Sequence, residues 1–229
     1  MPLKAENISK TFIRNGKNTN SFYAVEETDL LLENGTVTAV VGRSGSGKTT
    51  LLNMLSGLLT PTSGKVFYDG EDVYSFDDDV RSKLRNKSVG VIPQGQTGLK
   101  SLTVYENVLL PAEMYGSVSE EIKERADELL KAVGIGSLKD EYPNELSGGE
   151  LRRMAIARAL VNKPSFVLAD EPTGDLDDEN TLAVLKLLRS VADQGAAVLI
   201  VTHEKDTLTF ADKVYKMDAG KLSEVKKEE

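Results

Sequence analysis

The chain has 229 residues, with 28 Lys and Arg against 36 Asp and Glu; its net charge of −8 disfavours a nucleic-acid partner. It has no cysteine, which excludes disulfides and thiolate metal sites and fits a reducing compartment. No apolar run reaches the roughly 20 residues of a membrane span, and residues 1–6 lack the apolar core of a signal peptide. We therefore expect a soluble cytoplasmic protein of one or two lobes.

The first elements that we expect are two strands, over residues 3–9 and 22–32, joined by the polar loop of residues 14–20. The aromatic residues Phe12 and Tyr23 flank that loop. Either ring could stack on a purine, and either could be an ordinary strand or core aromatic. The residues alone leave this choice open.

A glycine-rich loop follows an apolar strand expected at 37–41 and precedes a helix expected at 50–55. The spacing GxxxxGK[ST] between a strand and a helix is the signature of a P-loop, whose backbone N–H groups surround phosphates at the positive end of the helix dipole. Lys48 would reach the β and γ phosphates, and the hydroxyl of Thr49 would bind Mg²⁺. The predicted nucleotide-binding residues of the loop are Gly42, Arg43, Ser44, Gly45, Ser46, Gly47, Lys48, Thr49 and Thr50.

The segment after the P-loop helix is predicted to contain a turn at 60–64, a short strand at 65–68 and an apolar strand at 88–92. Gln94 follows the last strand, at the carboxyl end where open α/β sheets place ligand-contacting groups. Taken alone, a glutamine in this position is more often a solvated loop residue.

Helical periodicity replaces the strand pattern from about residue 98 to 145. The apolar residues of 117–133 recur at helical spacing, and Ser117 with Glu120 can form a capping box. This pattern predicts a separate helical insert. Residues 144–150 then begin a second helix, whose Ser-Gly-Gly start is either an anion site or an ordinary helix start with a flexible cap.

A buried strand expected at 165–169 ends in two adjacent carboxylates, Asp170 and Glu171. In a P-loop protein one such acid holds Mg²⁺ and the next orients or deprotonates a water molecule. A helix expected at 178–193 follows this pair and ends before Gly195.

The last core strand, expected at 196–202, leads directly to His203, the only histidine of the chain. A lone histidine is more often structural than catalytic, but the carboxyl end of a core strand favours a functional role. A closing hairpin is expected at 212–222, and the charged tail 226–229 is expected to be frayed.

Together these motifs resemble, in order and spacing, the nucleotide-binding subunit of an ABC transporter; they are residues 42–49, Gln94, residues 146–150, Asp170, Glu171, residues 174–177 and His203. The resemblance covers nearly the whole chain and implies a single ABC ATPase domain over residues 1–229. Its fold would be α/β, a P-loop NTPase with a RecA-like core and an antiparallel β subdomain over residues 1–97 and 162–229. An inserted α-helical subdomain over about residues 98–161 would carry the signature motif.

The resemblance also implies the roles of the catalytic and metal-binding residues, with ATP and Mg²⁺ as cofactors. Thr49, Gln94 and Asp170 would hold Mg²⁺ directly or through water. Glu171 would be the general base for the attacking water. His203 would contact the γ-phosphate and position that water. Gln94 would be a catalytic residue together with Glu171 and His203.

Two such chains would face each other head to tail, with a homodimer expected. The signature residues of one chain would contact the γ-phosphate bound by the P-loop of the other, and Asp177 would lie at the dimer seam; the signature residues are Ser147, Gly148, Gly149 and Glu150. For adenine stacking, the family's Ser-Lys-Thr-aromatic context is present at residues 9–12, which favours Phe12 over Tyr23.

Three departures from the commoner family pattern are Pro93 before the glutamine, Glu150 in place of glutamine, and Gly-Asp at 174–175. The stretches 146–160, 171–174 and 202–204 nevertheless look like the branch of macrolide exporters, lipoprotein-release ATPases and antimicrobial-peptide exporters. Pro93 and Asp175 weaken the placement within that branch and leave the family resemblance intact.

The resemblance implies an ATP hydrolase that powers a separate integral membrane permease from the cytoplasmic side of the membrane, in export of a peptide, antibiotic or lipoprotein. A groove near Gln94 and the helical insert would receive short helices of the permease. One alternative is a cell-division type of mechanotransmission complex, which uses the same chemistry. A soluble ABC ATPase acting on DNA or ribosomes would need a basic face, two cassettes or a long coiled-coil insertion, none of which the sequence contains. A regulatory cassette without catalysis would lack Glu171, His203 or Ser147.

Overall fold

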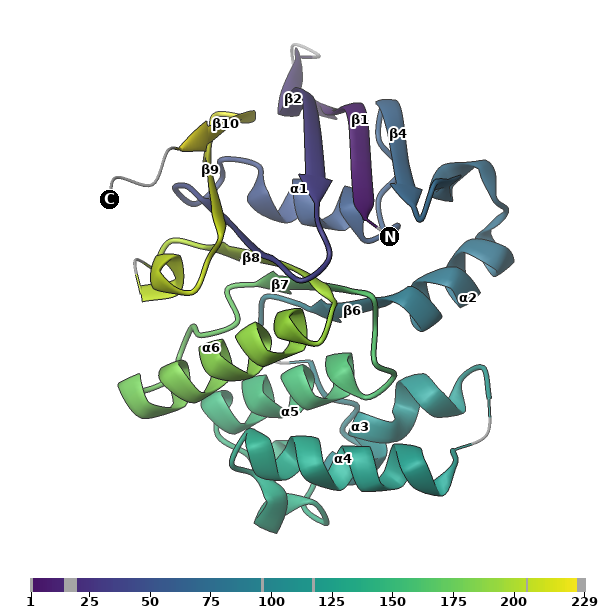
Figure 1. Cartoon of the computed structure of the whole chain (residues 1–229), viewed down its shortest axis with the longest axis vertical. Coiled ribbons are helices and arrows are strands. Elements are labelled where there is room, and N and C mark those ends of the chain that lie inside the picture. Colours follow the sequence, from purple (N-terminus) through teal and green to yellow (C-terminus); the bar gives the residue numbers. More distant parts are fainter. Residues whose placement is uncertain (1, 15–19, 96, 117, 205, 226–229) are drawn as a thin grey trace.

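The computed structural model describes residues 2–14, 20–95, 97–116, 118–204 and 206–225, which form two β-sheets and a group of helices (Figure 1). The strands are β1 (Leu3–Arg14), β2 (Asn20–Leu32), β3 (Val37–Val41), β4 (Ser63–Tyr68), β5 (Glu71–Asp72), β6 (Val89–Ile92), β7 (Phe166–Asp170), β8 (Ala197–Thr202), β9 (Lys213–Asp218) and β10 (Lys221–Val225). The α-helices are α1 (Lys48–Leu55), α2 (Asp78–Ser88), α3 (Val104–Glu113), α4 (Glu120–Ala132), α5 (Gly148–Leu160) and α6 (Asp178–Asp193). Short 3₁₀ turns lie at Val73–Ser75, Gly136–Leu138, Pro143–Glu145 and Asp206–Thr209.

The larger sheet has the strand order β10-β9-β3-β8-β7-β6, and its neighbouring strands are parallel except for β9 and β10. The central strands β7 and β8 are buried along their whole length. Strands buried on both faces carry apolar side chains at nearly every position and so appear in the sequence as continuous apolar runs. The strands predicted at 37–41, 165–169 and 196–202 are therefore present, each within one residue of its expected bounds.

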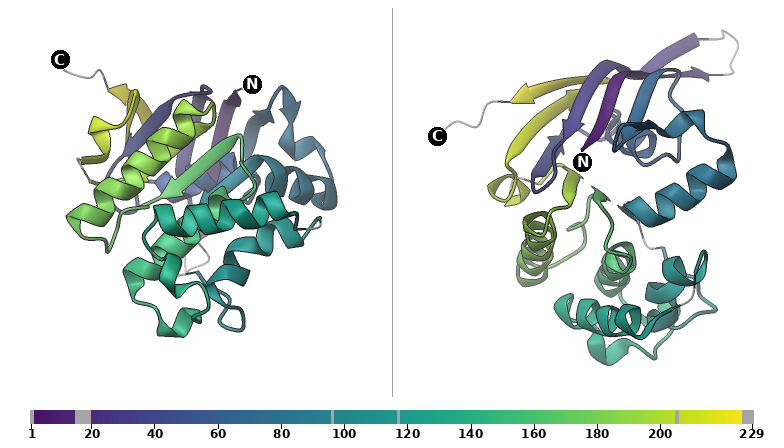
Figure 2. Two further views of the ribbon diagram at one scale, coloured as in Figure 1. Left: turned by 60° about the horizontal axis from the view of Figure 1, so that its bottom comes forward. Right: turned by 45° about the vertical axis from the view of Figure 1, so that its right-hand side comes forward.

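The two faces of this sheet enter different cores. On one face Ala39 and Ile200 pack with apolar residues of α3, α4, α5 and α6. On the other face Val40 and Val201 pack with α1 and the smaller sheet. The alternation follows from the two-residue period of a strand. Helix α1 is thus held between the two sheets, and the right-hand view of Figure 2 shows the strands layered above the helical group.

The smaller sheet is antiparallel, with the strand order β2-β1-β4-β5. Its first hairpin is longer than predicted, because β1 and β2 remain paired beyond the expected ends, with Phe12 opposite Phe22. The register shifts between residues 5 and 11 interrupt the local alternation of side chains, whereas the backbone pairing continues through them. Of the loop predicted at 14–20, residues 15–19 lie outside the described residues.

The segment predicted to be helical between residues 98 and 145 contains α3 and α4. The capping box predicted for Ser117 and Glu120 is wrong: α4 begins at Glu120, and its N-cap is Ser119, which accepts the N–H of Ile122. An N-cap stands directly before the first helical residue, and Ser119 has that position. Ser117 lies outside the described residues.

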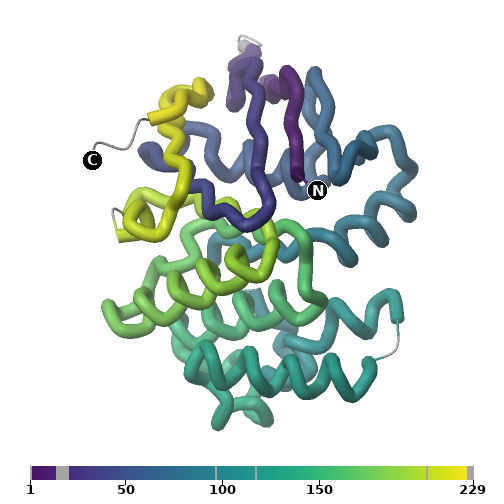
Figure 3. The backbone as a smooth tube through the Cα atoms, in the orientation of Figure 1, coloured from purple at the N-terminus to yellow at the C-terminus, as the bar shows by residue number. Residues whose placement is uncertain are grey.

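Helix α2 was not predicted; it follows the smaller sheet in the chain and leads directly into β6 of the larger sheet. None of its residues is buried, so it lacks the apolar period from which a helix is recognised. Its other signals are present: Asp77 caps it by accepting the N–H of Val80 at 2.9 Å, and its last turn is basic. The backbone trace in Figure 3 runs from the small sheet through α2 into β6 of the large sheet, then through α3, α4 and α5, and returns to the large sheet at β7.

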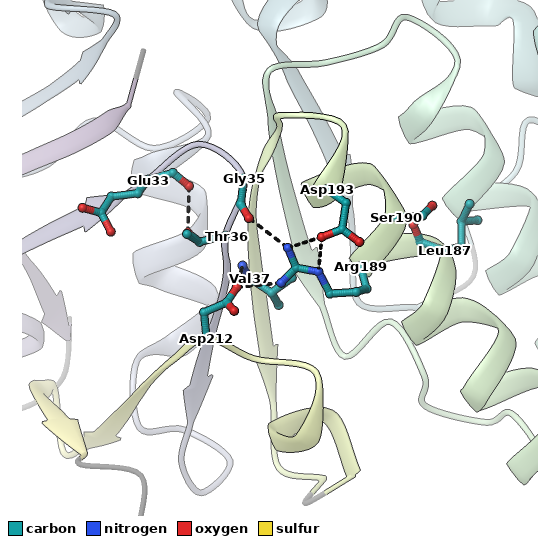
Figure 4. Close-up of polar contacts among 9 residues, drawn as sticks. All are labelled: Glu33, Gly35, Thr36, Val37, Leu187, Arg189, Ser190, Asp193 and Asp212. Atoms are coloured by element: carbon teal, nitrogen blue, oxygen red, sulfur yellow. Dashed lines mark hydrogen bonds and ion pairs between the residues drawn. The ribbon is translucent and has the colours of Figure 1, made fainter.

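A polar network holds the turn that leads into β3 (Figure 4). Arg189 on α6 donates to the carbonyl oxygen of Gly35 at 2.8 Å and to Oδ2 of Asp212 at 2.6 Å. The same Asp212 oxygen accepts the N–H of Val37, the first residue of β3, at 2.8 Å. Helix α6 thereby fixes the start of the strand whose other end carries the predicted P-loop.

The closing hairpin predicted at 212–222 is present as β9 and β10, which pair antiparallel. The predicted frayed tail 226–229 lies outside the described residues. Across the described part of the chain, no helix has the combined length and apolarity needed to cross a bilayer.

Candidate active site

A cleft of about 920 Å³ opens between the carboxyl ends of β3, β7 and β8 and the small antiparallel sheet. Most of the predicted loop borders it, together with residues that are distant in the sequence. Gly42 and Ser46 belong to the loop but do not line the cleft. The lining residues are Phe12, Phe22, Tyr23, Ala24, Arg43, Ser44, Gly45, Gly47, Lys48, Thr49, Thr50, Gln94, Asp170, Glu171, His203, Ala219 and Gly220.

The loop between β3 and α1 packs closely against neighbouring backbone, and two glycines make this possible. Gly47 has a left-handed φ of 108°, and a Cβ there would lie 2.1 Å from the carbonyl oxygen of Ala24. A Cβ on Gly42 would lie 2.2 Å from the carbonyl oxygen of Met217. Both positions therefore require glycine, whereas Gly45 has a φ of 76° but open space around it.

The ammonium group of Lys48 lies across the loop. It donates to the carbonyl oxygens of Gly42 at 2.8 Å and Arg43 at 3.0 Å, and the residue is 7% exposed. The hydroxyl oxygen of Ser46 is buried and has no hydrogen-bond partner among the described residues. The loop thus presents a cation to the cleft at the start of a helix, which suits a phosphate chain, whereas the buried hydroxyl of Ser46 does not line the cleft.

Thr49 and Asp170 join the loop to the end of β7. Oγ1 of Thr49 donates to Oδ2 of Asp170 at 2.6 Å, and Asp170 is almost fully buried. Burial raises the pKa of Asp170, while the hydrogen bond from Thr49 opposes that rise. A hydroxyl and a carboxylate oxygen in contact are hard oxygen ligands of the kind that Mg²⁺ prefers.

Glu171 follows Asp170 in a left-handed conformation, with a φ of 51°, and its N–H donates to the carbonyl oxygen of Val201 at 2.8 Å. Such strain in a residue other than glycine concentrates at functional sites. Nδ1 of His203, just beyond β8, lies 2.9 Å from Oε1 and 2.8 Å from Oε2 of Glu171. The hydrogen bond to Glu171 and the charge of that carboxylate raise the pKa of His203, whose side chain is largely exposed.

Gln94 lies just beyond β6, exposed at the edge of the cleft. The carbonyl oxygen of the preceding residue, Pro93, accepts a hydrogen bond from Nη1 of Arg152 at 2.7 Å. Arg152 belongs to α5 and is 5% exposed. The helix that begins with Ser-Gly-Gly is therefore tied to the segment that carries Gln94.

Three aromatic rings stand at the outer edge of the cleft. Phe12 and Phe22 lie side by side with ring centroids 6.1 Å apart, and Nζ of Lys10 lies 5.5 Å from the Phe12 ring. Phe12 is 37% exposed and Tyr23 is 62% exposed. Both predicted candidates for base stacking therefore border the cleft.

The Ser-Gly-Gly segment borders a different cavity, of about 450 Å³, which shares no lining residue with the cleft. Ser147 caps α5 in a capping box with Glu150, whose Oε2 accepts the N–H of Ser147 at 2.7 Å and its hydroxyl at 2.6 Å. These bonds lower the pKa of Glu150. The cavity is lined by Ser147, Gly148, Gly149, Arg153, Asp175, Leu176, Asp177 and Asn180.

Asp177 stands on the other side of that cavity, as the N-cap of α6. It accepts the N–H of Asn180 at 2.8 Å, and the amide oxygen of Asn180 accepts a hydrogen bond from Arg153 of α5. The bonds from Asn180 lower the pKa of Asp177. The P-loop cleft and the Ser-Gly-Gly cavity are thus separate hollows in one chain, each at the N-terminus of a helix.

Comparison with known sequences decides the family. The profile of the family described as "ABC transporter" matches residues 25–174, which include the P-loop, Gln94, Asp170 and Glu171. The chain belongs to the ABC transporter family.

Similar proteins carry the same assignment over almost the full length. The chain is 38% identical to an "Uncharacterized ABC transporter ATP-binding protein MJ1508" of Methanocaldococcus jannaschii over 97% of this chain and 98% of that protein. It is 41% identical to a "Lipoprotein-releasing system ATP-binding protein LolD" of Xanthomonas oryzae pv. oryzae over 97% of this chain and 91% of that protein. A solved dimer of the ATP-binding cassette MJ0796 in a post-hydrolysis state, bound to ADP and Pi, superposes with a TM-score of 0.92 at 34% identity, over 99% of both chains.

These similarities confirm the predicted P-loop NTPase fold with its parallel and antiparallel sheets. They also confirm the predicted activity: this ABC subunit binds and hydrolyses ATP and powers transport across a membrane.

Several residues that line the cleft of this ABC subunit were not predicted from the sequence, among them Phe22, Ala219 and Gly220. Phe22 is adjacent to Tyr23 in the sequence, and its pairing with Phe12 could have been found only from the register of the hairpin. Ala219 and Gly220 reach the cleft because the N–H of Gly220 donates to the carbonyl oxygen of Ser46 at 2.9 Å. Both residues lie within the hairpin predicted at 212–222, but nothing local to them indicates a ligand.

Proposed function

We propose that two copies of this ABC subunit close head to tail over ATP and so drive a separate membrane permease. The observation that carries the proposal is the separation of the P-loop cleft from the Ser-Gly-Gly cavity, which share no lining residue. A second copy brings its Ser147 turn to the phosphates held by the first copy's P-loop. In a homodimer each copy's P-loop cleft faces the other copy's Ser147 turn. Asp177, beside the second cavity, lies at the interface between the two copies.

Within the cleft, the phosphates of ATP are held by Lys48 and by the N–H groups around Gly47. Thr49 and Asp170 fit a divalent cation, because their side-chain oxygens already lie 2.6 Å apart. Gln94, at the cleft edge, adds an amide oxygen directly or through water. The chain itself would supply oxygen ligands from Thr49, Asp170 and Gln94. When bound, Mg²⁺ neutralises phosphate charge.

Glu171 acts as the general base. Its carboxylate stands next to Asp170 at the end of β7 and takes a proton from the attacking water. His203, in contact with that carboxylate, orients it and contacts the γ-phosphate. The strained backbone of Glu171 holds the carboxylate in place before ATP arrives, which reduces the reorganisation required for reaction.

The permease binds the groove beyond the end of α1, where α2 and β6 meet the helical group. This coupling groove has a volume of about 260 Å³ and is continuous with exposed apolar side chains of Leu58, Met114 and Tyr115. Gln94, near which this groove was expected, lines the nucleotide cleft instead. Exposed apolar side chains around a groove are suited to a short helix of a partner. The subunit accordingly works as a peripheral protein on the cytoplasmic side of the membrane.

The cargo that we propose is a lipoprotein, peptide or antibiotic moved outward. The support is the 41% identity to a protein named for lipoprotein release, together with the motif stretches that resemble that branch. The proposed cofactors are ATP and Mg²⁺, and no nucleic acid takes part in the reaction.

The decisive experiment is capture of Glu171→Gln with ATP and Mg²⁺ from solubilised native membranes. We expect this variant to retain ATP, to elute as a dimer, to hydrolyse ATP about 10²–10⁴-fold more slowly, and to co-purify a polytopic membrane protein. Lys48→Ala is the matched control that neither retains ATP nor dimerises. Near-normal turnover of Glu171→Gln would remove Glu171 from the role of base. Reproducible capture of only soluble proteins or nucleic acid would overturn the permease assignment.

A further inference from the structure

A cavity of about 690 Å³ lies between α2 and the helical group, on the side away from the nucleotide cleft, with which it shares no lining residue. Its apolar side chains come from α3, α4 and the end of α5; Val161 is fully buried, and Pro111 and Ile122 are partly buried. We call it the basic groove, because its rim carries four cationic side chains: Lys83, Lys87, Arg125 and Lys163.

The charges of the basic groove oppose those of the whole molecule. The chain has a net charge of −8, yet among the described lining residues Glu121 is the one carboxylate, and it pairs with Lys163 at 2.6 Å. Lys83 and Lys87 are both exposed and, one helical turn apart, lie on one face of α2. A local excess of positive charge on an acidic protein attracts an acidic partner selectively.

The geometry of the basic groove is held by asparagine side chains. Nδ2 of Asn86 donates to the carbonyl oxygen of Pro111 at 2.9 Å, and Nδ2 of Asn162 donates to the carbonyl oxygen of Asn86 at 3.3 Å. These bonds attach α2 to the helical group although α2 buries no side chain of its own. Lys83 and Lys87 of α2 therefore border the same cavity as Arg125 of α4.

The basic groove is also continuous with the coupling groove. Asn86, Pro111, Tyr115 and Asn162 line both. A chain segment that leaves the coupling groove past Tyr115, which is 46% exposed, enters the basic groove directly. The two surfaces can thus be occupied by adjoining segments of one partner.

We propose that the basic groove binds an acidic amphipathic segment of the membrane partner, adjoining the short helix that occupies the coupling groove. The proposal rests on the permease assignment above. The apolar floor suits one face of such a segment, and the cations spaced along the rim suit carboxylates on the other. A small anion would instead require cations that converge on one point, whereas these come from α2, α4 and Lys163 in the segment after α5.

The test places a photo-reactive benzoylphenylalanine at either Lys87 or Met114 of the Glu171→Gln subunit and identifies the peptide cross-linked in native membranes. We expect both positions to label the same polytopic protein, with the Lys87 adduct on a segment rich in Asp and Glu. Labelling from Met114 but not from Lys87, or a Lys87 adduct on lipid or on a neutral or basic segment, overturns the basic-groove proposal alone. If neither the Lys87 nor the Met114 position cross-links to a membrane protein, the permease assignment itself is overturned.

Charge reversal provides a second measurement. Lys83→Glu/Lys87→Glu should lower the amount of co-purified membrane protein by about tenfold at low salt, and less at high salt, because exposed charges are screened. Lys83→Gln/Lys87→Gln removes the two positive charges without adding negative charge to α2. It should lower the amount of co-purified membrane protein by a smaller factor. The matched control Lys186→Glu/Lys221→Glu changes exposed lysines outside both grooves and should have no effect. Equal losses in the test and control pairs, with unchanged ATPase activity of the isolated subunit, would overturn the proposal.

Discussion

Nδ1 of His203 lies within 2.9 Å of a carboxylate oxygen of Glu171, although the two residues are separated by 32 positions in the chain. They meet because β7 and β8 are parallel neighbours, with Asp170 opposite Val201, and each residue directly follows the end of its strand. The parallel pairing of β7 and β8 therefore brings together at the cleft two residues that helix α6 separates in the sequence.

This contact predicts the titration of His203. The hydrogen bond to Glu171 and its charge favour the protonated imidazole, so its pKa lies above the ordinary value of about 6.5. The contact stabilises the folded state fully below about pH 6.5, and this stabilisation is lost as the pH rises through the raised pKa. Since His203 is the only histidine, one NMR resonance reports it. In Glu171→Gln the midpoint should fall toward 6.5; an unchanged midpoint would contradict the contact.

The close packing of the P-loop predicts a difference between two glycines. Gly47→Ala should lower the free energy of unfolding by about 3 kcal/mol, because a left-handed alanine costs about 1–2 kcal/mol and its Cβ must also displace the Ala24 carbonyl. Gly45→Ala is the matched control, with a left-handed φ but open space, and should cost about 1 kcal/mol. Chemical denaturation measures both, and equal losses would contradict the steric explanation.

The aromatic edge of the cleft predicts which ring stacks on adenine. Phe12→Ala should weaken ATP binding by about 1–3 kcal/mol, the usual range for a base stacked on an aromatic ring. Tyr23→Ala is the comparison, because Tyr23 also borders the cleft but is more exposed. Calorimetric titration of ATP measures both variants. A loss confined to Tyr23→Ala would move the assignment to Tyr23.

The network at the start of β3 predicts a contribution to stability. Arg189→Ala removes hydrogen bonds to Gly35 and Asp212 and should lower the free energy of unfolding by about 1–2 kcal/mol. Asp193→Ala removes only an exposed ion pair with Arg189 and should change it by less than about 0.5 kcal/mol. Thermal denaturation would distinguish the two, and an effect of Asp193→Ala as large as that of Arg189→Ala would contradict this account.

The parallel core and the phosphate-binding loop could both be predicted from local patterns of residues. Strands buried on both faces carry apolar side chains at nearly every position. The strands β3, β7 and β8 can therefore be recognised in the sequence as continuous apolar runs. A loop that surrounds phosphates needs Gly47 and Lys48 at adjacent positions, and that requirement is local. The acids Asp170 and Glu171 were likewise identified from the strand that precedes them.

The features that depend on contacts between distant segments could be recognised only in the three-dimensional structure. Helix α2 buries no residue, so no apolar period marks it, and it is held by Asn86 and Asn162 across the groove. The pairing of Phe12 with Phe22 follows from a hairpin register that includes bulges. The bond from Arg152 to the Pro93 carbonyl joins residues 59 positions apart. Patterns in the sequence report local chemistry and burial, whereas partners across the fold are set by the packing of the whole chain.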